Sequence, residues 1–209
     1  MGRHEDCHVP RPKNRTLDFL WLPYPNELAG EVENWVATLE EQEAADAAFF
    51  SRKAGAGEGK PPVANATALA RVPPKGSLVM ASTCLWHVLW TDNAANFGEV
   101  MGRFARALAA VQKKRPMDVL LLTCPTVWTD LINGPNSRRK QIKMVPPTLA
   151  AYDQVIRGLR MPVLDHAGIT RRCGPVCTMD GVHSGAHLYE AEVQVALNYF
   201  EHWKMGLKP

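Results

Sequence analysis

The sequence lacks any apolar run long enough to cross a membrane. A transmembrane helix needs about 20 consecutive apolar residues, and the 209-residue chain contains no such stretch. Its first residues also lack the apolar core of a secretory signal, and Asp6 stands where a myristoylation signal requires Ser or Thr. From the sequence as written we expect no membrane span and no export signal.

The chain also lacks a large excess of charge of either sign. Its net charge is +3, and its basic clusters, at 113–115 and at Arg138-Arg139-Lys140, are short. A nucleic-acid-binding protein usually carries a larger basic face, so we expect no nucleic acid as a partner. The run at 138–140 is interpreted as a solvated loop, with attraction of an anionic substrate or partner as the alternative.

Cysteine is scarce and odd in number. Five cysteines are too few for a disulfide scaffold and leave at least one unpaired. Cys173 and Cys177 flank a Gly-Pro turn and would close a short loop in an oxidising compartment, with which the sequons at Asn14 and Asn65 are compatible. Whether these two cysteines are paired stays open.

The remaining composition is that of one globular domain. We expect a disordered arm at 1–15 and a single domain at 16–205, with a flexible Gly/Pro-rich insertion at 51–76. Periodicity predicts strands at 17–22, 77–84, 118–124 and 161–165, and helices at 27–50, 97–114, 146–160 and 188–205. This alternation predicts an α/β three-layer sandwich, in which helices flank a mainly parallel sheet.

Asp180-Gly-Val-His183 is the most informative stretch, because it lies in the last crossover, just before the final helix. An acid three residues before a histidine on a tight turn can bond to Nδ1 of the ring. Nε2 is then left to accept a proton from a nucleophile. We therefore predict that Asp180 and His183 are catalytic, the alternative being a turn cap beside a solvent-facing histidine.

Met179-Asp180-Gly-Val-His183 before a terminal helix resembles the last signature block of SGNH (GDSL-like) hydrolases. Further stretches, in the same order, are similar to the PC-esterase branch, which includes sialate O-acetyltransferases and plant trichome-birefringence-like polysaccharide acetyltransferases. They are Phe19–Tyr24, Ser77–His87, Leu121–Trp128 and Ala150–Val155. The resemblance implies an acyl-ester hydrolase or O-acetyltransferase, acting on carbohydrate acetyl esters without a cofactor, in which Asp180 and His183 complete a Ser-His-Asp triad.

The chain departs from this family at the nucleophile, because the N-terminal Gly-Asp-Ser block is not found. Other serines lack the strand-to-helix context of an activated nucleophile; they are Ser51, Ser77, Ser137 and Ser184. We therefore expect an N-terminally truncated SGNH-like domain, secretory or Golgi-lumenal by resemblance, with an exposed sheet edge that a protein partner would cover. The alternative is a complete, cytoplasmic and catalytically inactive scaffold or partner-binding protein.

Three other groups of residues are candidates for the site. Thr83, Trp86 and His87 follow a predicted strand and are expected to line the substrate pocket, although His87 alone is interpreted as structural or surface-exposed. Cys84 and Cys124 end neighbouring strands and are expected to be free and buried, the alternative being a cysteine nucleophile served by His183. His183 and His187, with Asp165 and His166, offer metal-ligand types but no complete site, so no metal is predicted.

Overall fold

The computed structural model describes residues 7–11, 15–19, 24–52 and 65–204. None of the helices in these segments has both the length and the apolar character needed to cross a membrane. The elements, in chain order, are β1 (Cys7–Arg11), β2 (Arg15–Phe19), α1 (Pro25–Arg52), α2 (Ala66–Arg71), β3 (Leu78–Ala81), α3 (Cys84–Trp90), α4 (Ala94–Lys114), β4 (Asp118–Leu122), the 3-10 helix η2 (Thr129–Leu131), α5 (Ser137–Lys143), α6 (Pro146–Gly158), β5 (Val163–Leu164), α7 (His166–Cys173), the 3-10 helix η3 (Pro175–Cys177) and α8 (Ala186–Lys204).

The centre of the fold is a parallel sheet of three strands in the order β3-β4-β5. Val79 is the partner of Val119, and Ala81 and Val163 are both partners of Leu121. Successive side chains of a strand point to opposite faces. The register therefore places these apolar residues together on one face of the sheet.

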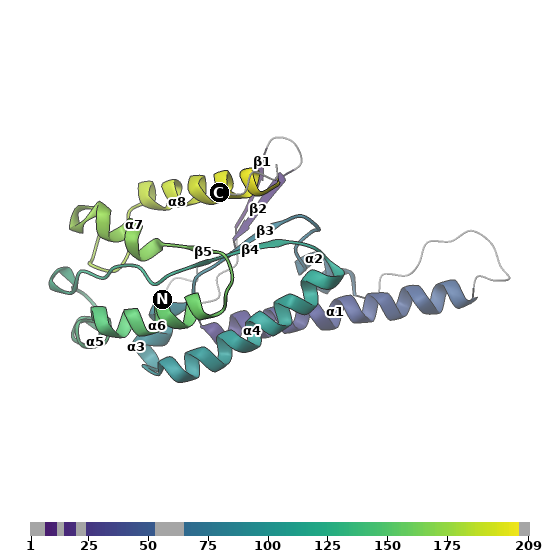
Figure 1. Ribbon diagram of the computed structural model, residues 1–209, viewed down its shortest axis with the longest axis horizontal. Helices are drawn as coiled ribbons and strands as arrows, with labels where there is room; N and C mark the ends of the chain where they lie inside the picture. Colours follow the sequence, from purple (N-terminus) through teal and green to yellow (C-terminus); the bar gives the residue numbers. More distant parts are fainter. Residues whose placement is uncertain (1–6, 12–14, 20–23, 53–64, 205–209) are drawn as a thin grey trace.

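Helices cover both faces of this sheet (Figure 1). Val119 and Leu121 of β4 belong to the larger core cluster, to which α1, α4 and α6 contribute, whereas Leu120 and Leu164 belong to a smaller cluster with Ala196 of α8. A sheet that is apolar on both faces needs a layer of helices on each. The α/β three-layer prediction is confirmed.

Helix α4 shows why the sequence forms these layers. Asn93 caps its first turn by accepting a hydrogen bond from Asn96 N at 3.0 Å. The apolar side chains that it buries recur at helical spacing, and they are Phe97, Val100, Met101, Phe104, Leu108 and Val111. The predicted helix at 97–114 is thus confirmed with a slightly earlier start.

The chain before α1 differs from the prediction. The strand expected at 17–22 was assigned to the parallel sheet, but β2 pairs antiparallel with β1, and residues 7–11 of the expected disordered arm form that partner strand. Antiparallel strands need only a short connection, whereas parallel strands need a long crossover. Of the insertion expected at 51–76, residues 53–64 lie outside the described residues, and Ala66–Arg71 forms α2.

Short helices make up the other differences. Strand β3 ends at Ala81, and Cys84–Trp90, whose beginning was expected to continue the strand, forms α3. The basic run at 138–140 lies in α5 rather than in a loop. Helix α7, which follows β5, was not predicted. These segments are too short for periodicity to identify.

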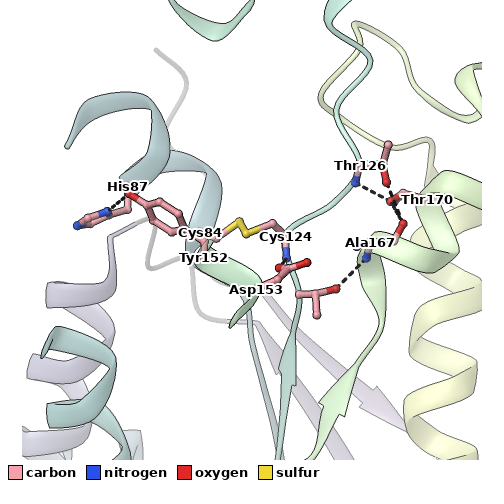
Figure 2. Close-up of a disulfide and its surroundings, with 9 residues drawn as sticks. Cys84, His87, Cys124, Thr126, Tyr152, Asp153, Ala167 and Thr170 are labelled. Atoms are coloured by element: carbon pink, nitrogen blue, oxygen red, sulfur yellow. Dashed lines mark hydrogen bonds between the residues drawn. A yellow bond between two sulfur atoms is a disulfide. The ribbon is translucent and has the colours of Figure 1, made fainter. Parts of the chain in front are cut away.

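A disulfide between Cys84 and Cys124 ties together the segments that follow β3 and β4 (Figure 2). Both cysteines are almost completely buried, and their Cα atoms are 5.7 Å apart. The sequence placed them at neighbouring strand ends but predicted free thiols, which is wrong for both. The disulfide holds the carboxyl ends of two parallel strands in register.

We predict that this disulfide contributes more stability than the one between Cys173 and Cys177. Its cysteines are 40 residues apart rather than 4, and the loop-closure entropy removed from the unfolded chain gives about 4 kcal/mol against about 2 kcal/mol. Urea denaturation of Cys84→Ala/Cys124→Ala and Cys173→Ala/Cys177→Ala measures the difference. Equal losses in the free energy of unfolding of the two variants would contradict the prediction. So would a peptide map of the non-reduced protein in which Cys84 and Cys124 are not linked.

Candidate functional site

The Asp180 turn, residues 178–184, lies between η3 and α8. Its two ends pair through a β-bridge between Thr178 and Ser184, and Met179 N donates to His183 O at 3.0 Å. At its base, Gly185 N donates to Cys177 O at 2.8 Å. At its tip, Val182 is buried in the larger core cluster. The backbone and the core therefore hold the turn in place, independently of any contact of the His183 side chain.

The two oxygens of Asp180 have different partners. Oδ1 accepts hydrogen bonds from the backbone N–H groups of Val182, at 3.0 Å, and His183, at 2.8 Å. Oδ2 lies 2.8 Å from Nδ1 of the His183 ring. A carboxylate only accepts hydrogen bonds, so Nδ1 carries the proton and Nε2 presents its lone pair. The side chain of His183 is 63% exposed and that of Asp180 25%.

The carboxyl of Asp180 is held in its ionised form. Partial burial alone would raise its pKa, but the hydrogen bonds from the backbone and ring of His183, and from Val182 N, lower the pKa below its usual value. Asp180 is therefore a carboxylate at neutral pH. It combines the turn cap and the histidine partner that the sequence analysis treated as alternatives, and the exposed Nε2 is free to accept a proton.

Gly181 lets the turn approach the loop that follows β4. Its φ is +81°, in the left-handed region that favours glycine. A Cβ atom there would lie 2.5 Å from Trp128 O and 3.0 Å from Ile132 N. Trp128 N in turn donates to Gly181 O at 2.8 Å. This backbone contact positions the turn at the carboxyl edge of the sheet.

The predicted substrate-binding residues lie on α3 or at its start, and their part in the site stays a prediction. Thr83 is buried at the start of α3, and Trp86 is half-buried with its ring edge against Tyr24, at 6.2 Å between ring centroids. Neither residue, nor His87, lines the small cavity beside the turn. That cavity is lined by residues that the sequence analysis did not select, among them Thr126, Trp128, Thr170 and Ser184.

His87 belongs to the core. It is 2% exposed, and it links two side chains. Tyr152 Oη lies 2.9 Å from Nδ1 (Figure 2), and Asn96 Oδ1 lies 3.1 Å from Nε2. Burial lowers the pKa of His87, against the opposing effect of the Asn96 hydrogen bond. His87 is therefore a neutral structural histidine. It is buried rather than surface-exposed, and its part in substrate binding stays a prediction.

Threonines connect the loop after β4 to α7 (Figure 2). Thr126 N donates to Thr170 Oγ1, and Ala167 N donates to Thr123 Oγ1, each at 2.8 Å. Nearby, Cys124 N donates to Asp153 Oδ1 at 2.8 Å, and burial raises the pKa of Asp153 despite this hydrogen bond. The pattern of Thr123-Cys-Pro-Thr126 after an apolar strand was the only sequence signal for this network.

The four residues weighed as metal ligands are directed to other partners. Asp165 pairs with Arg157 at 2.9 Å, His183 with Asp180, and His166 with Glu192 in a buried pair that the sequence analysis missed. His187 Nε2 instead lies 3.4 Å from Cys177 Sγ. In the described part of the chain, Cys173, Cys177 and His187 have ligand atoms within 4.8 Å of one another.

Two disulfides exclude two roles for the cysteines that they contain, that of metal ligand and that of nucleophile. Cys173 and Cys177 are bonded to each other, so neither offers the thiolate that a metal ligand requires. Cys84 and Cys124 are likewise bonded to each other and cannot act as a nucleophile for His183.

We predict that Gly181→Ala destabilises the protein by about 2–4 kcal/mol, because it adds a steric clash to the cost of a left-handed backbone. Gly134→Ala is the matched control: its φ is +77°, but a Cβ atom there would meet nothing within 4 Å. The control is expected to lose about 1–2 kcal/mol in the free energy of unfolding. Equal losses would contradict the close approach of Gly181 to Trp128.

We predict that Asp180→Asn lowers stability by about 1 kcal/mol at pH 7, the scale of one charge-assisted hydrogen bond. The pKa of Asp180 is lower in the folded than in the unfolded protein. Its ionised form therefore stabilises the fold above the unfolded pKa, about 3.9, and this contribution is lost as pH falls through the folded value. Urea titrations of both proteins from pH 7 to pH 3 should show the difference shrinking; a constant difference would contradict the pairing.

One comparison with known proteins gives a match over most of the chain. The chain is 30% identical over 215 residues to Protein ALTERED XYLOGLUCAN 9 of Arabidopsis thaliana. The alignment covers 94% of this chain and 49% of that protein, so the chain spans about half the length of the curated relative it matches. No protein-family model and no solved structure matches. Over nearly its whole length, the chain is thus similar to part of a longer plant protein.

Proposed function

We propose that this chain carries the acid–base pair of an SGNH-type acyl-ester hydrolase or O-acetyltransferase that acts on carbohydrate acetyl esters. The observation that carries the proposal is the 2.8 Å contact between Asp180 Oδ2 and His183 Nδ1 at the carboxyl edge of a parallel sheet. In open α/β sheets, this edge is where substrates bind and reaction chemistry takes place. The exposed Nε2 is accessible to an approaching hydroxyl group.

The pair would act by proton transfer at Nε2. A hydroxyl oxygen attacks the acyl carbon while its proton moves to Nε2, and the imidazolium that forms is stabilised by the Asp180 carboxylate. The same proton then passes from Nε2 to the departing oxygen as its bond to the acyl carbon breaks. Water as the final acceptor gives hydrolysis, and a sugar hydroxyl gives transfer.

Carbohydrate is the proposed substrate class for two reasons. The ordered set of motifs resembles the PC-esterase branch, and the Arabidopsis relative is named for xyloglucan, a polysaccharide. Both reasons come from similarity, so the substrate requires a direct test.

A second candidate, a catalytically inactive scaffold or partner-binding protein, is favoured by one observation. Among the described residues, no side-chain hydroxyl or thiol is hydrogen-bonded to Nε2 of His183. Four of the five cysteines are in disulfides. The proposed enzyme therefore needs a nucleophilic oxygen from outside these side chains.

We predict that His183→Ala lowers kcat for acetate release by about 10²–10⁴-fold, the usual contribution of a general base. The substrates are p-nitrophenyl acetate and an acetylated xyloglucan oligosaccharide. His187→Ala is the matched control, since it removes a nearby exposed imidazole that has no carboxylate partner among the described residues, and it should retain activity within a few-fold.

Two results would contradict the proposed function. Wild-type turnover no higher than that of a heat-denatured sample would favour the scaffold. Equal turnover by wild type and His183→Ala would show that His183 is not the base.

A further inference from the structure

Helix α5 concentrates the positive charge of the chain. It carries Arg138, Arg139, Lys140 and Lys143, and no Asp or Glu occurs from residue 131 to residue 152. These four charges exceed the net charge of the whole chain, +3. The positive field is therefore localised at one helix rather than spread over the surface.

The side chains of α5 border a shallow, open groove. It is lined by Asn136, Ser137, Arg138, Arg139, Ile142 and Lys143. Ile142 is 65% exposed, which is unusual for an isoleucine and leaves an apolar surface between polar groups. The groove thus combines cationic, hydrogen-bonding and apolar surfaces.

Half of these charges already have a partner, and half do not. Lys143 pairs with Asp92 at 3.3 Å, and the guanidinium of Arg139 lies 4.5 Å from the ring centroid of Trp90. Within the described segments, Arg138 has no carboxylate in ion-pair contact, and it lines the groove. One cation of the groove is therefore available to a ligand, next to two that are held in place.

The groove is connected to the Asp180 turn through one short element. Gln141 Nε2 donates to Ile132 O at 3.3 Å, which joins α5 to the end of η2. Trp128, which precedes η2, donates its N–H to Gly181 O. Helices α5 and α7 lie at the same end of the molecule, and the turn follows α7 by way of η3 (Figure 1). An extended ligand held along α5 would therefore lie near His183.

We propose that the α5 groove binds carboxylate-bearing sugar units, so that the carbohydrate acyl acceptor is an acidic, uronate-containing polysaccharide. This inference rests on the proposed function. Arginine binds planar carboxylates with paired hydrogen bonds, Asn136 and Ser137 offer partners for sugar hydroxyls, and Ile142 offers an apolar contact for a pyranose face. Single-stranded nucleic acid fits less well, because Arg139 lies over a face of Trp90, the aromatic ring beside the groove, and limits base stacking there.

The test compares two oligosaccharides by isothermal titration calorimetry on the full chain: a galacturonate hexamer and a neutral xyloglucan heptasaccharide. The wild type should prefer the galacturonate, and its affinity should fall as NaCl rises. Arg138→Gln should weaken galacturonate binding by about tenfold. The control, Arg106→Gln, removes one exposed cation from α4 and should stay within twofold.

The outcomes separate this inference from the proposed function, because binding is measured without turnover. Equal affinity for the two oligosaccharides, or unchanged affinity in Arg138→Gln, would overturn the groove even if p-nitrophenyl acetate is hydrolysed. Salt-sensitive galacturonate binding without any ester turnover would support the groove and contradict the ester chemistry.

Discussion

Strand β4 has no polar face, and the rest of the fold depends on this. Val119 and Leu121 pack into one core while Leu120 and Leu122 pack into the other, so each face must be covered by helices. Parallel pairing with β3 and β5 then requires long connections that return to the same end of the sheet. The three strands of this sheet consequently end at one edge, and the segments that leave them meet there.

The contacts at that edge are mostly made by backbone groups and small polar side chains. The Cys84–Cys124 disulfide ties the segment after β3 to the loop after β4, and the threonine hydrogen bonds tie that loop to α7. Gly181 then places the Asp180 turn against the same loop. The turn is thus positioned by contacts on the loop after β4, although it lies more than fifty residues later in the chain.

Much of the fold follows from the sequence because burial on both faces leaves a clear pattern. The apolar runs at 118–124 and 161–165 predict strands that the structure confirms in shorter form, and α4, α6 and α8 follow from helical periodicity. Cys84–Trp90 extends an apolar run and therefore resembles a strand, although it forms α3. The position of His87 was beyond sequence reasoning, since its core partner Tyr152 is 65 residues away. The pairing of β2 with β1 could not be predicted, because the sequence of β1 has no clear alternation of apolar and polar residues.

The Asp180–His183 contact was predictable because both residues lie in one turn. Its proposed role depends on the different partners of the two Asp180 carboxylate oxygens. Oδ1 alone satisfies the backbone N–H groups of the turn. Oδ2 contacts a ring that is 63% exposed, and exposed ion pairs contribute about 0–1 kcal/mol to stability. The contact between Oδ2 and the ring therefore adds little to the stability of the fold. The proposed acid–base chemistry gives a reason for this contact, because that chemistry requires the tautomer that the contact selects and an accessible Nε2.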